Sequence, residues 1–365
     1  MSQSPAASVG VALAGVALAA AFLPWMGAGT TVAGLTVGSV VGAALAGVAL
    51  LAFLLRRHEL LPRAWGAPLA GLASGAVVCA AIYTLLAPAL TDATAGALGS
   101  GLPVAAFSGL FALGAAVADG ADISAKRLSR MVRDVAIASA VGLISFLVGM
   151  ALSIIPTSIV ADVGFAVQFG VFTTFFGLGL ALSAIAYLKL REIGLDYIDI
   201  RMPSKRDLAY AVGGVVVLYG AAIAISILLQ SLGLSGAESS IEQQAREGNP
   251  TLLLVLIPLS WLVIGPGEEL VFRNIVQKSL YDSFSERAAV VVASCIFALI
   301  HIPQYYSATN PASTFTTLVV IFILSLLLGE TYRRTGNLVV PILIHGTFNA
   351  VQFFQLYIQL AGSPV

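Results

Sequence analysis

The chain has 365 residues, of which 59% are hydrophobic and 10% are charged, and its formal net charge at pH 7 is zero. Soluble globular proteins carry about 25% charged residues, whereas the mean hydropathy of this chain is +0.97. These values exclude a water-soluble globular fold and predict an all-α polytopic membrane protein embedded in the lipid bilayer. The balanced charge gives no reason to expect a nucleic-acid partner.

Apolar segments long enough to cross a bilayer recur along the whole chain. A transmembrane helix needs about 17–25 mostly apolar residues. This criterion predicts about eleven spans, namely 8–26, 31–55, 67–90, 102–118, 135–155, 165–188, 208–229, 251–281, 287–304, 313–332 and 337–360.

The basic residues predict the orientation of these spans. Nearly all lysines and arginines lie in the connections that follow the even-numbered spans, and the connections that follow odd-numbered spans carry only Arg246. Basic connections of membrane proteins face the cytoplasm. We therefore expect a multi-pass protein of the cell membrane with a cytoplasmic N-terminus and a C-terminus outside.

The longest basic connection, residues 189–207, divides the chain. We expect it to lie along the cytoplasmic surface of the membrane. Residues 1–188 would then form an N-terminal six-helix membrane region of unknown role, and residues 208–365 a C-terminal helical bundle.

Ionisable side chains deep inside the predicted spans are confined to the C-terminal bundle. They are Glu268, Glu269, Arg273, His301 and His345. Such groups are costly within a bilayer and by default mark a functional site.

The depths of four polar residues agree. Because a helix rises about 1.5 Å per residue, Glu268, His301, His345 and Asn349 each lie roughly 16–23 Å from the cytoplasmic end of their span. The spans alternate in direction, yet these residues reach one layer. His345 and Asn349 are four residues apart and project from one face of the last span.

The two adjacent glutamates are expected to have different partners. Glu269 and Arg273 are spaced i, i+4 with the acid first, which favours an ion pair. Adjacent helical residues point about 100° apart, so Glu268 is left without a local partner. His301, on the next span, is its expected partner.

The stretch Gly265-Pro266-Gly267 precedes the glutamates directly. Pro266 removes a backbone donor and disrupts the local helical hydrogen bonding. One interpretation is a loosened helix that admits water beside Glu268, and the other is an ordinary kink without a chemical role.

Three ordered motifs resemble those of the CPBP family of intramembrane proteases. The motifs are Glu268-Glu269-x-x-x-Arg273, Phe297-x-x-x-His301 and His345-x-x-x-Asn349. This family includes the CAAX prenyl protease 2 (Rce1-type) enzymes, the Abi proteins and bacteriocin-processing proteins. The resemblance covers about residues 195–360, and the first six spans match no motif.

The resemblance implies a catalytic C-terminal bundle that hydrolyses peptide bonds of a membrane-associated or lipidated protein or peptide. Glu268 is the implied water-activating residue, and His301 assists it. His345 and Asn349 are implied to stabilise the oxyanion of the tetrahedral intermediate.

The remaining motif positions have supporting roles in the same resemblance. Glu269 with Arg273 would hold the first motif in shape, and Phe297 would pack nearby. This set needs no cofactor.

Two alternatives stay open at this point. Glu268, His301 and His345 also form a Glu/His/His set that matches a catalytic zinc site with its fourth position open to water. Paired acids and histidines within a membrane also suit a transporter, and a non-catalytic immunity protein could keep the same fold.

Overall fold

The structure, a computed structural model, describes residues 4–23, 31–32, 35–90, 101–307 and 310–361. The chain divides into two compact units, which are described separately. The first unit comprises Met1–Val132, Leu232–Leu234 and Ser307–Ser313, and the second comprises Arg133–Ser231, Ser235–Tyr306 and Thr314–Val365. The division into residues 1–188, 189–207 and 208–365 is expected from the position of a basic connection and not from packing. It stays a prediction.

The first unit is built from four helices with small side chains between them. They are α1 (Pro5–Ala21), α2 (Val37–Arg57), α3 (Arg63–Leu90) and α4 (Gly101–Gly120), with two short antiparallel strands, β1 (Thr31–Val32) and β2 (Leu35–Thr36). Buried alanines such as Ala14, Ala49 and Ala112 allow the helix backbones to approach closely. Arg56 of α2 and Asp119 of α4 form a buried ion pair at 2.8 Å.

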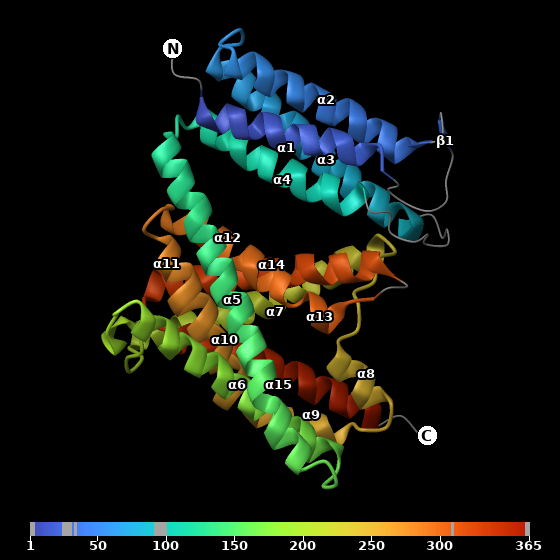
Figure 1. The fold of residues 1–365 in the computed structure, drawn as a ribbon. Coiled ribbons are helices and arrows are strands. Elements are labelled where there is room, and N and C mark those ends of the chain that lie inside the picture. Colours follow the sequence, from blue (N-terminus) through green and yellow to red (C-terminus); the bar gives the residue numbers. More distant parts are fainter. Residues whose placement is uncertain (1–3, 24–30, 33–34, 91–100, 308–309, 362–365) are drawn as a thin grey trace. The chain divides into compact units, whose positions relative to one another are not determined.

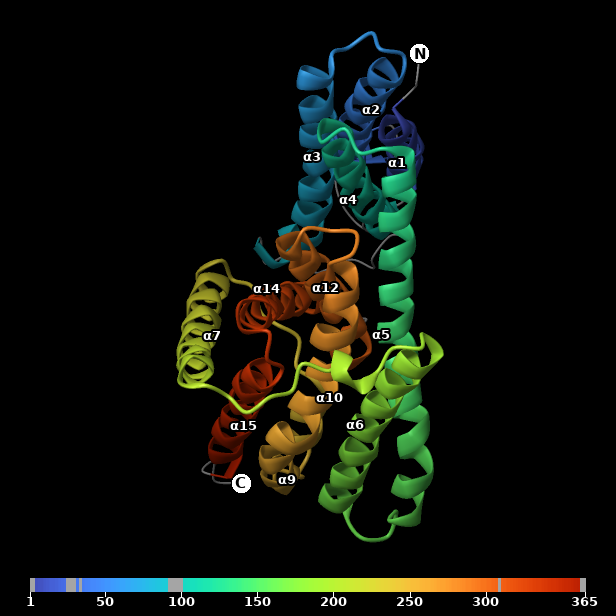
Figure 2. The ribbon, with the colours of Figure 1, turned by 90° about the vertical axis from the view of Figure 1, so that its left-hand side faces the viewer.

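The second unit contains the predicted site. Its helices are α5 (Ala125–Ile159, from Arg133 onward), α6 (Phe165–Leu190), η1 (Leu195–Tyr197), α7 (Lys205–Ser231), α8 (Ser240–Arg246), α9 (Thr251–Leu259), η2 (Ser260–Ile264), α10 (Gly265–Glu269), η3 (Leu270–Gln277), α11 (Lys278–Leu280), α12 (Glu286–Ile300), α13 (Ile302–Tyr305), α14 (Pro311–Thr335) and α15 (Val339–Ala361). Helices α7, α15, α9–α10 and α6 pack side by side in that order, as Figure 2 shows. A buried core that includes Leu188, Phe272 and Ala293 joins α6, η3 and α12.

Apart from the two short strands, the regular secondary structure of the described residues is helical, which agrees with the predicted all-α fold class. Each of the eleven predicted segments contains a helix. Among the described residues, however, eight helices are long and apolar enough to cross a membrane, so a count of eleven spans is not established. Helix α1 and the described part of α4 are shorter apolar helices, and α12 has 15 residues.

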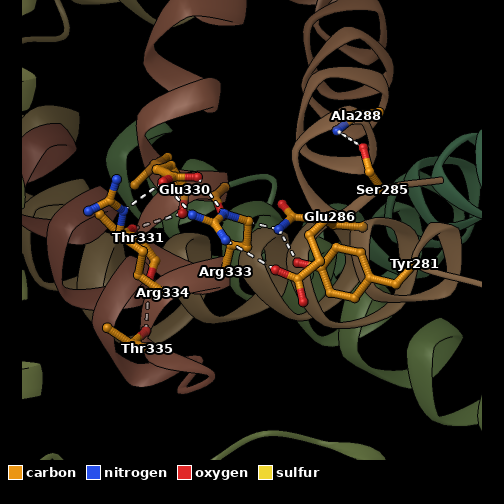
Figure 3. Close-up of polar contacts among 12 residues, drawn as sticks. Tyr281, Ser285, Glu286, Ala288, Glu330, Thr331, Arg333, Arg334 and Thr335 are labelled. Carbon is orange, nitrogen blue, oxygen red and sulfur yellow. Dashed lines mark hydrogen bonds and ion pairs between the residues drawn. The ribbon is translucent and has the colours of Figure 1, made fainter.

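One end of the second unit is rich in ion pairs. Near the last turn of α14, Glu330 accepts hydrogen bonds from Arg333 at 2.7 Å and from Arg334 at 2.6 Å. Arg333 also bonds to Glu286 in the first turn of α12 at 3.1 Å (Figure 3). The end of α14 and the start of α12 therefore lie together, and we name this the basic end of the unit.

The basic connection between α6 and α7 is fixed to the same end. Asp199 accepts hydrogen bonds from Lys278 at 2.9 Å and from the Tyr332 hydroxyl at 2.5 Å. Its backbone N–H donates to Asn274 Oδ1 at 2.9 Å. Burial raises the pKa of the neighbouring Tyr197 hydroxyl. The connection is thus tied to the helix that carries the two adjacent glutamates.

Candidate active site

The two adjacent glutamates lie on a single continuous helix whose hydrogen-bonding pattern changes around them. Residues 251–280 are helical throughout, but the segments on both sides of α10, η2 and η3, have wider π-helical turns. Short π-helical segments inside α-helices occur often at functional sites. The helix therefore continues through the Gly-Pro-Gly stretch with wider turns on both sides of it, and the admission of water beside Glu268 stays a prediction.

The glycines of this stretch bring neighbouring helices close. A Cβ atom on Gly265 would lie 3.2 Å from the carbonyl oxygen of Ile342 on α15, and one on Gly267 would lie 3.3 Å from the carbonyl oxygen of Gly177 on α6. Both glycines are buried. They position α10 against the helix that carries His345.

Glu268 faces the two histidines across a short gap. Its Oε2 atom lies 4.0 Å from Nε2 of His301 and 3.9 Å from Nε2 of His345. The Glu268 side chain is 17% exposed. The structure therefore brings together three residues from three helical segments, as their depths predict. Their separations are too long for direct hydrogen bonds but suit one bridging water molecule.

Glu269 is fully buried and has two partners, of which the sequence indicated one. Its Oε2 accepts a hydrogen bond from Nε of Arg273 at 2.8 Å, as the i, i+4 spacing predicts. Its Oε1 lies 2.8 Å from Nδ1 of His345. Sequence spacing gave no indication of this second contact. Glu269 thus anchors a histidine of the site as well as an arginine of its own helix.

Arg273 is held by groups on two other helices. Its Nη1 donates to Oγ of Ser325 on α14 at 3.0 Å, and its guanidinium carbon lies 4.9 Å from the ring centroid of Phe297. Within the described chain, Nη2 has no hydrogen-bond partner, so the ring face supplies part of the stabilisation of this buried cation. Ser325 was missed from the sequence, where its only signal is a single hydroxyl in an apolar run.

The hydrogen bonds place a proton on Nδ1 of both histidines. Nδ1 of His301 lies 2.7 Å from the carbonyl oxygen of Phe297, which can only accept, so this nitrogen carries a proton. In the neutral His301 ring, Nε2 is then an acceptor directed toward Glu268. Nδ1 of His345 likewise donates to Glu269, which is ionised opposite Arg273.

Glu268, His301, His345 and Asn349 all line one cavity of about 750 Å³. Asn349 is half-buried, and no hydrogen bond to its side chain is formed by the residues that the structure describes. Its amide is therefore available to a bound molecule. Phe297 also lines the cavity and packs against His301 with ring centroids 4.5 Å apart.

The zinc alternative requires Glu268, His301 and His345 as ligands. Two ligands of a tetrahedral zinc with bonds of about 2.1 Å lie roughly 3.4 Å apart, and the closest atoms here are separated by 3.9 and 4.0 Å. Across the described ranges, no group of three or more His, Cys, Asp or Glu side chains is arranged to hold a metal ion.

Comparison with known proteins agrees with the motifs. Residues 250–351 match the family model described as type II CAAX prenyl endopeptidase Rce1-like. The match includes α9 to α13, α14 and the part of α15 that carries His345 and Asn349. No curated protein and no solved structure matches the chain. The resemblance noted in the sequence is thus confirmed over this segment: residues 250–351, within a multi-pass membrane protein, match the Rce1-like family model.

Proposed function

We propose that this protein is an intramembrane endopeptidase in which Glu268 activates a water molecule for attack on a peptide carbonyl. The observation that carries the proposal is the separation of 4.0 and 3.9 Å between the Glu268 carboxylate and the two imidazole nitrogens, inside a cavity. Such distances allow one water molecule to contact all three groups.

The reaction can be written with the residues of this chain alone. Glu268 takes a proton from the water, whose second hydrogen is held by Nε2 of His301. The hydroxide adds to the carbonyl carbon, and the resulting oxyanion is stabilised by the Asn349 amide and by Nε2–H of His345 in its doubly protonated form. Glu268 then gives its proton to the leaving amine as the C–N bond breaks.

Glu269 keeps the site in this arrangement. Its two oxygens hold Arg273 and His345 at 2.8 Å each. A donor fixed in place before the reaction costs no reorganisation when charge develops on the oxyanion. Glu269 and Arg273 therefore act as positioning residues.

The substrate is a membrane-associated protein or peptide. CAAX-type lipidated proteins and peptide precursors of the bacteriocin kind are both consistent with the site. We also propose, from the basic connections, that the basic end of the second unit faces the cytoplasm.

Cleavage of an internally quenched peptide pool by the protein in liposomes tests the proposal. Glu268→Gln should reduce the rate by about 10²–10⁴-fold, the usual contribution of a general base. Glu247→Gln, which changes an exposed acid outside the cavity, should leave the rate unchanged. A transporter or an immunity protein would show no cleavage by any variant. Equal rates for wild type and Glu268→Gln would refute the assigned role of Glu268.

A further inference from the structure

The cavity extends from the site toward one end of the second unit. On α15 its lining residues fall within 345–359, on α12 and α13 within 297–305, and on α6 within 169–176. Helices α15 and α12 start at the basic end, whereas α6 finishes there. On each of these helices the lining therefore runs from the level of Glu268 toward the opposite end, where Ser240 and Arg246 of α8 also line the cavity. We name this the α8 end.

Helix α15 carries amide side chains along this path. Gln352, Gln355 and Gln359 follow His345 and Asn349 on the helix, and all five line the cavity. The first two glutamines are exposed, and the described part of the chain offers neither of them a hydrogen-bond partner. An amide without a partner is costly in an apolar environment. Both amides are therefore free to bind a polar group that enters the cavity.

We propose that Gln352 and Gln355 bind the main chain of an unfolded polypeptide segment, which reaches Glu268 from the α8 end. A primary amide both donates and accepts hydrogen bonds, as a peptide group does, so side chains of this kind recognise an extended backbone with little regard to sequence. The path leads directly to Asn349 and His345, where the carbonyl to be cleaved must lie.

The inference rests on the proposed peptidase function and extends it to the substrate. The α8 end lies opposite the basic end, so in the proposed orientation it faces away from the cytoplasm. The substrate is then a peptide segment presented at the outer face of the membrane, held by its backbone rather than by a charged motif.

Steady-state kinetics with the quenched peptide pool test the binding role. Gln352→Leu and Gln355→Leu should each raise KM about fivefold through the loss of one hydrogen bond, with kcat little changed. The matched control is Gln243→Leu, which removes an exposed glutamine of α8 that does not line the cavity. An unchanged KM in both α15 variants, or an equal rise in the control, overturns the inference.

A binding measurement separates failure of this inference from failure of the proposed function. The same pool, fluorescently labelled, is titrated into the Glu268→Gln protein with and without Gln352→Leu, and anisotropy gives the Kd. Weaker binding in the double variant supports the binding role even if no cleavage is detected with wild type. Equal binding refutes it whatever the activity.

Thiol labelling tests the direction of entry without using activity. In a Cys79→Ala, Cys295→Ala background, single cysteines replace Gln355 or Arg191, the latter an exposed residue of the basic connection. A membrane-impermeant maleimide should label the two positions from opposite sides of oriented vesicles, and the peptide pool should protect only position 355. Labelling of both positions from one side, or no protection by the pool, overturns the proposed route.

Discussion

The same substitution at two adjacent glutamates should have very different effects on stability. Glu269 is fully buried, and each of its oxygens has a partner at 2.8 Å. Glu269→Gln leaves the Arg273 guanidinium buried without an opposing charge, and loss of one partner of a buried ion pair costs about 3–5 kcal/mol. Glu268 is 17% exposed and makes no contact shorter than 3.9 Å with the two histidines. Glu268→Gln should therefore change the free energy of unfolding by no more than about 0.5 kcal/mol.

Both variants should lose cleavage, for different reasons. Glu268→Gln removes the group that takes the proton, whereas Glu269→Gln releases His345 from its anchor. Unfolding of the purified protein in detergent, followed by circular dichroism, measures stability, and the quenched peptide pool measures the rate. The reasoning is refuted if Glu268→Gln destabilises the protein as much as Glu269→Gln does, or if Glu269→Gln keeps wild-type stability.

Three further tests concern the surroundings of the site. Ser325→Ala removes the acceptor of Arg273 Nη1 and should lower the free energy of unfolding by about 1–3 kcal/mol; an unchanged midpoint would show that this contact is dispensable. Gly346→Ala places a Cβ 2.7 Å from the Trp261 ring and should lower the unfolding midpoint, at a cost of about 1–3 kcal/mol. Gly213→Ala, with no atom within 4 Å of its Cβ, serves as its control and should not lower the midpoint. Dialysis against a chelator should leave the cleavage rate unchanged, and elemental analysis should find no zinc; stoichiometric zinc with loss of activity on its removal would replace the metal-free mechanism.

The contacts of several site residues could be predicted from the sequence because each prediction used only the local geometry of a helix. The i, i+4 rule paired Glu269 with Arg273, and a constant rise per residue placed Glu268, His301 and His345 at one depth. Both arguments use helix geometry alone, which every spanning segment shares. The same geometry could not distinguish a short helix from a full span, so the number of crossings was not determined.

The sequence by itself determined that this chain is a helical membrane protein, that its costly polar groups lie in the C-terminal helices, and that three motifs are Rce1-like. Composition and short-range periodicity carry that information, because a bilayer penalises every charged residue individually. Only the tertiary structure decided that Glu269 also holds His345, that Ser325 supports Arg273, and that the glycines beside Glu268 pack against α15 and α6. Such contacts join residues that are 52 to 90 positions apart in the chain, and the relative rotation of packed helices, which no local spacing specifies, decides which side chains meet.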